Sequence, residues 1–291
     1  MKVCGFTFIR NAIKFDYPIV EAITSILPLC DKFIVVVGNS SDNTKNLIER
    51  IDPEKIKIID SNWDDSLREG GRVLAEETNK AIDQLPSDYD WAFYIQGDEV
   101  VHEKYLPVIK KGMHDFINQP NVDGLLFNYT HFFGSYDYVG LKYSWYRKEI
   151  RVIRNDKNIF SYKDAQGFRK KPNEKLQVKL INASIFHYGW AREPEALQGK
   201  EKSKVRFYHN DNWISQNFSR SDKYEYDSMP EPIRKFNDTH PQVMLERVKR
   251  KNWLFNPNLS LKYSSFKDKF KRVMGNLTGW YPGEYKNYKR I

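Results

Sequence analysis

The stretch DWAFYIQGDEVVHE, residues 90–103, decides the fold of this chain. Its apolar and aromatic run, residues 91–95, leads directly into Gln96, Gly97, Asp98 and Glu99. A short continuous apolar run is typical of a strand buried on both faces of a parallel sheet. In open α/β sheets, ligands bind beyond the carboxyl ends of such strands. Two carboxylates at this point therefore indicate a binding site as well as a turn.

Strand and helix signals alternate through the residues before this stretch, as a parallel sheet requires. Three signals predict where the intervening helices begin: Asp16 as a cap with Pro18 in the first turn, Asp42 as a cap, and a capping box formed by Ser66 and Glu69. The fourth strand ends at Asp98. The preceding strands are predicted at residues 3–9, 33–37 and 56–59.

Beyond residue 103 the pattern is looser. A stretch between residues 211 and 229 is polar and has no clear period. The remaining signals predict helices over 104–117 and from Met244, and strands over 124–130, 149–154 and 176–186.

Charge and composition limit the class of protein. The 291 residues are 40% hydrophobic and 29% charged, which fits a globular protein with a real core. Cys4 and Cys30 are too few for a disulfide framework, so reduced thiols and a cytoplasmic location are expected. The first residues, MKVCGFTFIRN, lack a signal-peptide pattern, and no run approaches the roughly 20 apolar residues of a membrane span.

The excess positive charge lies at one end of the chain. The formal net charge is +9, and the residues from Lys249 onward carry eleven Lys or Arg against two acidic residues. This tail is also rich in large apolar side chains, so peripheral contact with the inner face of a membrane and a packed helical extension are both open interpretations, whereas nucleic acid, the third class of partner for a basic tail, is not expected. Its large apolar residues include Trp253, Leu254, Phe255, Phe266, Phe270 and Trp280.

Several familiar motifs are missing from the sequence. No GxGxxG follows the first predicted strand, no P-loop is present, and neither paired cysteines nor HExxH indicate zinc. Asp98 and Glu99 remain, together with His187 in IFHYGWAREPEAL, residues 185–197. An oxygen-rich site with few protein ligands suits Mg²⁺ or Mn²⁺ bridging a diphosphate, where it would neutralise charge on a leaving group.

The order of these segments resembles a family 2-type glycosyltransferase with the GT-A fold. The resemblance is carried by LPLCDKFIVVVGNSSDNT, by a Gly-bearing helix, and by DWAFYIQGDEVV, and it covers roughly residues 3–103. It implies an α/β fold with a Rossmann-type, mostly parallel sheet flanked by helices, followed here by a basic, helical C-terminal extension. It also implies a nucleoside diphosphate sugar as donor, with UDP favoured, and Mn²⁺ or Mg²⁺ as cofactor.

The same resemblance implies roles for individual residues. Asp98 takes the last position of a DxD-type metal motif whose first position is Gln96, and His187 matches a late histidine that completes the metal site. Asp164, in FSYKDAQGF, lies where the family places the general base, with Asp137 and Glu149 as lesser candidates. The implied nucleotide-sugar contacts are Arg10, Asn39, Gly71, Arg72, Gln96 and Asp98, and Tyr129, His131, Trp145 and Tyr146 are candidates for the acceptor site.

Taken together, the sequence predicts a metal-dependent, inverting glycosyltransferase that acts on a glycan or lipid-linked acceptor, as in polysaccharide biosynthesis. The predicted organisation is a nucleotide-sugar-binding half over residues 1–103, an acceptor-binding half over 104–205 and a C-terminal extension over 206–291. Two alternatives remain open at this point. One is a non-catalytic protein that binds nucleotide sugars or glycans and docks through its basic tail; the other is a sugar nucleotidyltransferase.

Overall fold

Four parallel strands form the N-terminal half of the central sheet in a computed structural model, which describes the chain except for residues 219–220, 227–231, 260–265 and 279–280. The strands lie in the order β3–β2–β1–β4, so all four carboxyl ends meet at one edge. They span β1 Val3–Ile9, β2 Lys32–Gly38, β3 Ile56–Ser61 and β4 Trp91–Tyr94.

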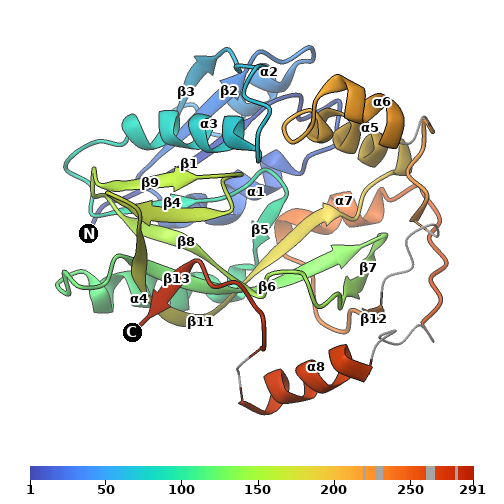
Figure 1. Ribbon diagram of the computed structural model, residues 1–291. Coiled ribbons are helices and arrows are strands. Elements are labelled where there is room, and N and C mark those ends of the chain that lie inside the picture. The colour runs from blue at the N-terminus through green and yellow to red at the C-terminus, as the bar shows by residue number, and fades with distance from the viewer. Residues whose placement is uncertain (219–220, 227–231, 260–265, 279–280) are drawn as a thin grey trace.

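The second half of the sheet mixes parallel and antiparallel pairs (Figure 1). After β4 the order continues β8–β6–β11–β10–β9, with β6 and β11 parallel. These strands are β5 Glu99–Val101, β6 Gly124–Phe133, β7 Ser135–Gly140, β8 Lys148–Arg154, β9 Ile159–Tyr162, β10 Gly167–Lys170 and β11 Glu174–Trp190. The predicted strands beyond residue 103 are therefore confirmed, although β11 is longer than expected.

Helices cover both faces of the parallel strands because successive side chains point to opposite sides of a sheet. In β2, Phe33 and Val35 pack in the cluster that contains helix α1, whereas Ile34 and Val36 pack in the cluster that contains helix α3. The helices of this half are α1 Ile19–Ile26, α2 Thr44–Glu49, α3 Arg72–Asp83 and α4 Leu106–Phe116. An α/β fold with a Rossmann-type sheet flanked by helices is thus confirmed.

Two predicted helix starts are wrong. Asp16 does not cap α1, since Pro18 holds the N-cap position and Asp16, with φ of 48°, instead pairs with Arg247. The predicted capping box is also absent, because α3 begins only at Arg72, after Gly71 in the left-handed region. Helix α3 begins later than predicted, because two consecutive glycines with positive φ prolong the loop before it. Asp42, in contrast, does accept a bond from the backbone N–H of Thr44 at the start of α2.

Strand β4 is shorter than predicted, since it ends at Tyr94 and leaves residues 95–98 as a turn. The region from residue 211 was expected to lack regular structure, yet it begins with a short helix capped by Asn210. The remaining helices are α5 Pro194–Val205, α6 Asp211–Asn217, α7 Leu245–Lys249 and α8 Phe266–Thr278. Short 3₁₀ turns cover Leu27–Leu29, Glu103–Tyr105 and Gln242–Met244.

The C-terminal extension is only partly helical. Strand β12, Ile233–Lys235, pairs with β7, and strand β13, Tyr288–Arg290, pairs with β11 close to the chain end (Figure 1). Trp253 donates to the carbonyl of Gly134, so this part of the tail packs on the domain. Leu254 and Phe270 are exposed, whereas Trp280 and the side chain of Phe266 lie outside the described residues. Among the described helices, none is both long and apolar enough to cross a membrane.

Candidate functional site

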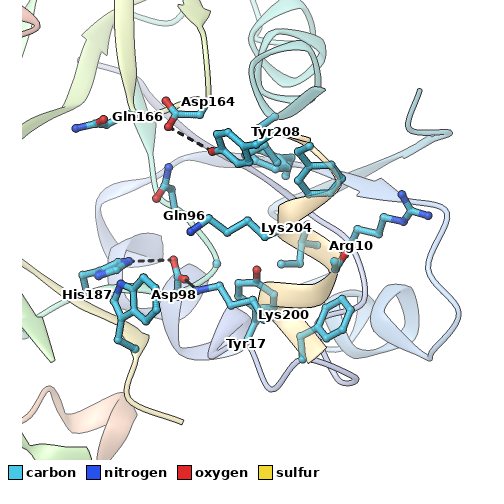
Figure 2. A pocket seen from close by; sticks show the side chains of 18 of the residues that line it. Arg10, Tyr17, Gln96, Asp98, Asp164, Gln166, His187, Lys200, Lys204 and Tyr208 are labelled. Carbon is cyan, nitrogen blue, oxygen red and sulfur yellow. Dashed lines mark hydrogen bonds and ion pairs between the residues drawn. The ribbon is translucent and has the colours of Figure 1, made fainter. Parts of the chain in front are cut away.

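A cavity of about 360 Å³ opens at the carboxyl edge of the parallel strands. Arg10 follows β1, and Gln96 and Asp98 follow β4, so the topology of the sheet brings these three predicted residues together. Helix α5 and the turn after it form another wall. Seven predicted site residues line this cavity (Figure 2): Arg10, Gln96, Asp98, Trp145, Tyr146, Asp164 and His187.

One part of the cavity wall is aromatic. Trp63 packs against Phe8 and Phe207, with ring centroids 5.8 and 5.5 Å away. The guanidinium of Arg10 lies 5.4 Å from the Trp63 ring and forms an ion pair with Asp65 at 2.9 Å. Flat apolar rings beside a cation can stack with a planar heteroaromatic group such as a nucleobase.

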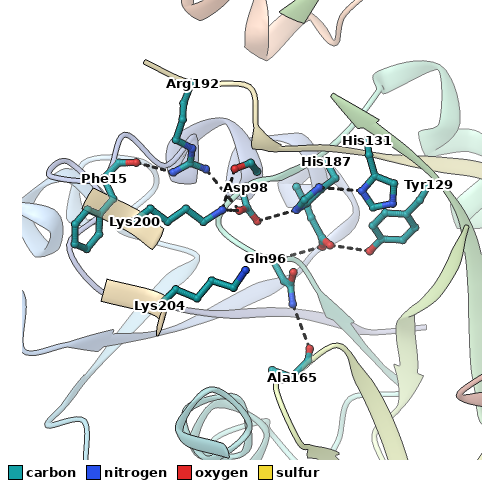
Figure 3. A network of polar contacts seen from close by, with 12 residues as sticks. Phe15, Gln96, Asp98, Tyr129, His131, Ala165, His187, Arg192, Lys200 and Lys204 are labelled. Atoms are coloured by element: carbon teal, nitrogen blue, oxygen red, sulfur yellow. Dashed lines mark hydrogen bonds and ion pairs between the residues drawn. The ribbon is translucent and has the colours of Figure 1, made fainter. Parts of the chain in front are cut away.

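Another part is a charged cluster centred on Asp98, shown in Figure 3. The ammonium of Lys200 lies 2.9 Å from Oδ2 of Asp98 and also donates to the carbonyl of Gly189 at 3.0 Å. Arg192 lies 3.6 Å from the same carboxylate oxygen, and Nε2 of His187 lies 3.8 Å from Oδ1. All four side chains are buried.

Burial and charge act in opposite directions on this cluster. Burial alone would raise the pKa of Asp98, but the positive charges of Lys200 and Arg192 hold that pKa well below its ordinary value. Burial lowers the pKa of Lys200 to about 8 even though Asp98 opposes the shift. It also lowers the pKa of His187 well below its ordinary value, so this imidazole is neutral near pH 7.

The tautomer of His187 follows from its neighbours. Burial lowers the pKa of His131 to about 4, so this ring is also neutral. Nε2 of His131 lies 2.7 Å from the carbonyl oxygen of Tyr146, which can only accept, so Nε2 carries the proton. Nδ1 of His131 then accepts from Nδ1 of His187 at 3.0 Å. The lone pair of His187 is therefore on Nε2, the nitrogen nearer to Asp98.

Asp164 reaches the cavity from the loop between β9 and β10. Both of its neighbours, Lys163 and Ala165, have positive φ, at 55° and 59°. Non-glycine residues held in this region are uncommon and cluster at functional sites. The hydroxyl of Tyr208 donates to Oδ2 of Asp164 at 3.4 Å, and the amide of Gln96 donates to the carbonyl of Ala165 at 3.2 Å.

Gly71 is adjacent to this loop, although it does not line the cavity. A Cβ at Gly71 would lie 2.7 Å from Cβ of Asp164 and 2.8 Å from the hydroxyl of Tyr208. Arg72 is exposed and pairs with Glu76 at 3.4 Å, away from the cavity. Asn39 lines a separate hollow beside Ser40 and Asp42. The structure therefore does not bring Arg72 and Asn39 together with the other predicted donor contacts.

The four acceptor-site candidates meet in a neighbouring hollow of about 180 Å³. Trp145 and Tyr146 also line the main cavity, whereas Tyr129 and His131 do not. Tyr129 donates to Glu99 at 2.7 Å, so its hydroxyl already has a structural partner.

Glu99, the acid that directly follows Asp98, faces away from the cavity. Its carboxylate forms a bidentate pair with Arg151 at 2.7 and 2.8 Å, and both side chains have no exposed surface. Two adjacent acids after β4 thus have different environments, because one follows the turn into the cavity and the other begins β5.

Sequence reasoning missed the contribution of α5 and the turn that follows it. Lys200 and Lys204 extend from α5 toward Asp98 and Gln96, as Figure 2 shows, and Phe207 and Tyr208 follow on the next turn. The only signal was the placement of PEALQGKEKSKV shortly after His187. Its lysines are typical of a solvated helix face, and nothing local distinguishes Lys200 from Lys202.

The residues around Asp98 do not fit a divalent metal ion. Mg²⁺ and Mn²⁺ favour several oxygen ligands, but among the described residues the only carboxylate paired with His187 is Asp98, and two cationic side chains already pair with it. Over the part of the chain that the structure describes, no group of three or more His, Cys, Asp or Glu residues could hold a metal ion. Asp98 and His187 do meet as predicted, at 3.8 Å between Nε2 and Oδ1, but the other oxygen of the carboxylate, Oδ2, is already paired with Lys200.

The sequence matches no protein-family model and no curated protein. Several solved structures are similar to this chain. TarS from S. aureus is 13% identical with a TM-score of 0.41, over 70% of this chain and 39% of TarS. Glucosyl-3-phosphoglycerate synthase from Mycobacterium tuberculosis, in complex with Mg²⁺ and uridine diphosphate, is 16% identical with a TM-score of 0.30, over 45% of this chain and 43% of that chain.

A third similar structure, 4-diphosphocytidyl-2C-methyl-D-erythritol synthase from Anaerococcus prevotii, is 9% identical with a TM-score of 0.34, over 53% of this chain and 71% of that chain. This chain spans less than half of the length of TarS and of glucosyl-3-phosphoglycerate synthase. Similarity at this level carries no information on the substrate or activity of this chain.

Proposed function

We propose that this protein is a glycosyltransferase that moves a sugar from a nucleoside diphosphate sugar to an acceptor hydroxyl. The observation that carries the proposal is the cavity at the carboxyl edge of β1 and β4, in which an aromatic wall, a cationic cluster and the carboxylate of Asp164 face one space. Each of these three features suits one part of such a reaction.

The donor is proposed to bind along the aromatic and cationic walls. Trp63 and Phe207 would stack with the base, and Arg10 lies over the same ring system. Lys200 and Lys204 would contact the diphosphate, whose charge rises as the bond to the sugar breaks. Preorganised cations at such a leaving group stabilise the transition state.

Asp164 is proposed as the general base that takes the proton from the acceptor hydroxyl. In this role Asp164 takes the proton and does not itself attack the sugar. The acceptor hydroxyl then displaces the diphosphate in line, which inverts the configuration at the sugar carbon. The neighbouring hollow bounded by Tyr129, His131 and Trp145 would hold the acceptor, since aromatic faces pack against the apolar faces of sugars. A glycan or lipid-linked acceptor is compatible with a hollow that opens beside the main cavity.

The first experiment is a binding panel of UDP, GDP, CDP and dTDP, each with excess EDTA and with Mn²⁺. A ligand that binds only the folded state raises the melting temperature by mass action, and calorimetry then gives its affinity. Stabilisation by one nucleoside diphosphate under either condition supports the proposal and selects the donor sugars for turnover assays. Failure of all four under both conditions would refute it.

Asp164→Asn tests the proposed base. General-base catalysis contributes about 10²- to 10⁴-fold, so turnover should fall by that factor. The affinity for the nucleoside diphosphate should stay within a few-fold, because Asp164 does not contact the proposed diphosphate site. Asp222→Asn, at a side chain with 97% exposure, is the matched control. Equal turnover in the two variants would exclude Asp164 as the base.

A non-catalytic binding protein remains the second candidate, favoured by the neutral Gln96 at the first position of the metal-motif-like segment. Such a protein would bind the nucleoside diphosphate but turn over no donor, by hydrolysis or transfer. Release of free nucleoside diphosphate from a donor sugar, lost in Asp164→Asn, would exclude it.

A further inference from the structure

We infer that Lys200, with Arg192 and Lys204, takes the place of a divalent metal ion, so that this protein binds and uses its nucleoside diphosphate substrate without one. The inference rests on the proposed function and concerns the way in which the same cavity neutralises the diphosphate. It departs from the sequence-based prediction of a Mn²⁺ or Mg²⁺ site at Asp98 and His187.

The position of the Lys200 ammonium carries the inference. It lies 2.9 Å from Oδ2 of Asp98, the carboxylate that follows β4 at the edge of the sheet. It donates a second bond to the carbonyl of Gly189, which holds it beside Asp98. A bulge in β11 between His187 and Trp190 contains this carbonyl, and a Cβ at Gly189 would lie 2.5 Å from Nε2 of His187. A Cβ there would also lie 2.9 Å from Oδ2 of Asp98, so glycine at this position leaves room for the His187 and Asp98 side chains.

Lys200 retains the capacity to bind a ligand. An ammonium group has three N–H donors, and Asp98 and Gly189 account for two of them. Lys200 also lines the cavity, as does Lys204 one turn further along α5. The Lys204 side chain is 40% exposed and, in Figure 2, extends to the vicinity of Gln96. A diphosphate in the cavity would thus meet two ammonium groups from one helix.

The charge of the cluster equals that of a simple metal site. Asp98 contributes one negative charge, and Lys200 and Arg192, which both lie beside it, contribute one positive charge each, so these three side chains carry a net charge of +1. A divalent ion held by one carboxylate has the same net charge. A second carboxylate at position 96 would cancel this excess, whereas the neutral Gln96 preserves it.

Arg192 holds this charge in place from behind the cavity. Its side chain is 1% exposed and donates to the carbonyl of Phe15 at 2.6 Å. Within the described residues, its Nε and one terminal nitrogen have no hydrogen-bond partner. A buried guanidinium whose donors are incompletely used is costly in a folded protein, and it raises the positive potential next to Asp98.

The test measures binding of UDP, UMP and uridine, and of the best nucleoside diphosphate from the panel, by calorimetry in metal-stripped buffer with excess EDTA. Wild-type protein should bind the diphosphate in EDTA, more tightly than the monophosphate and the nucleoside, and Mn²⁺ should change that affinity by less than about twofold. Turnover of the matching donor sugar in EDTA should equal turnover with Mn²⁺.

Lys200→Met keeps the length of the side chain and removes its charge. A charge-assisted hydrogen bond to phosphate corresponds to about tenfold to a hundredfold in affinity, so diphosphate binding in EDTA should weaken by that factor. Binding of uridine should not change. Lys202→Met is the matched control, because Lys202 lies on the same helix and pairs with the exposed Asp222. Lys204→Met leaves the ion pairs of Asp98 intact and is the second variant if Lys200→Met fails to fold.

The outcomes separate this inference from the proposed function. Binding and turnover that require Mn²⁺ or Mg²⁺ would overturn the inference and leave the glycosyltransferase proposal standing. Unchanged diphosphate affinity in a folded Lys200→Met, or in Lys204→Met where that variant replaces it, would also overturn the inference. No binding of any nucleoside diphosphate, with or without metal, would refute the proposed function itself.

Discussion

Glu99→Gln should strongly destabilise the fold, because it leaves the guanidinium of Arg151 buried without its counter-ion. Both side chains have no exposed surface, and two direct bonds at 2.7 and 2.8 Å join them. Glu99 also accepts from the hydroxyl of Tyr129 at 2.7 Å and from the backbone N–H of Gln96 at 3.1 Å. A glutamine keeps one acceptor oxygen but turns an N–H donor toward the guanidinium of Arg151, which can only donate.

The expected loss follows from this geometry. Removing one partner of a buried ion pair costs about 3–5 kcal/mol, a large share of the roughly 5–15 kcal/mol that stabilises a typical domain. At roughly 2 °C for each kcal/mol in a chain of this size, the melting temperature should fall by about 6–10 °C. Urea unfolding followed by tryptophan fluorescence measures the loss as a lower midpoint with an unchanged slope.

Glu76→Gln is the control for this prediction. Glu76 is 45% exposed and lies 3.4 Å from Arg72, and surface pairs of this kind contribute less than about 1 kcal/mol. Adding Arg151→Met to Glu99→Gln removes the unpaired charge and should recover part of the loss. A loss below about 1 kcal/mol in Glu99→Gln, or a loss equal to that of Glu76→Gln, would refute the reasoning.

Two further predictions concern Glu149 of β8 and the glycines that precede α3. Burial raises the pKa of Glu149 to about 8, although Arg151 and the hydrogen bond from Gln166 oppose the shift. Between its ordinary pKa of 4.5 and a pH of about 8, the folded protein therefore keeps a proton on Glu149 that the unfolded chain releases. The resulting stability is complete below about pH 4.5 and is lost by up to about 1.4 kcal/mol per unit as the pH rises toward 8. Glu149→Gln should remove this decline in urea midpoints, and a parallel decline in both proteins would contradict the shift. Gly71→Ala places a Cβ against Asp164, whereas at Gly70, which also has positive φ, nothing lies within 4 Å of a Cβ. Both alanines should cost roughly 1–2 kcal/mol of backbone strain, but only Gly71→Ala should also lower turnover; equal turnover would show that Gly71 does not position Asp164.

The pattern of the sequence was sufficient to predict the strands and the edge of the sheet where the cavity lies. Apolar runs at β1, β2 and β4 are long enough to identify buried parallel strands, and the residues that follow parallel strands must meet at one edge. Arg10 and Asp98 lie together for that reason. His187 joins them because β11 pairs with β6 and β5 in the same sheet. The sequence alone indicates this position only through a distant histidine in an apolar setting.

Local signals were less reliable where backbone conformation decided the outcome. The Ser66–Glu69 spacing satisfies a capping box, but the positive φ of Gly70 and Gly71 delays the helix to Arg72. Asp98 and Glu99 are adjacent acids that the sequence does not distinguish. Only the turn into β5 directs the carboxylate of Asp98 toward the cavity and that of Glu99 toward Arg151.

What only the tertiary structure decided is the charge balance of the site. Lysines of α5 have the pattern of a solvated helix, and their sequence does not show which one will be buried. Packing of α5 across the cavity buries Lys200 and leaves the side chain of Lys202 40% exposed, although the two lysines are only two positions apart in the same helix. A buried ammonium persists only beside a carboxylate, and the carboxylate that it meets is Asp98, 102 positions earlier in the chain. The sequence by itself therefore determined where the cavity forms, while long-range packing determined which cation lies within it.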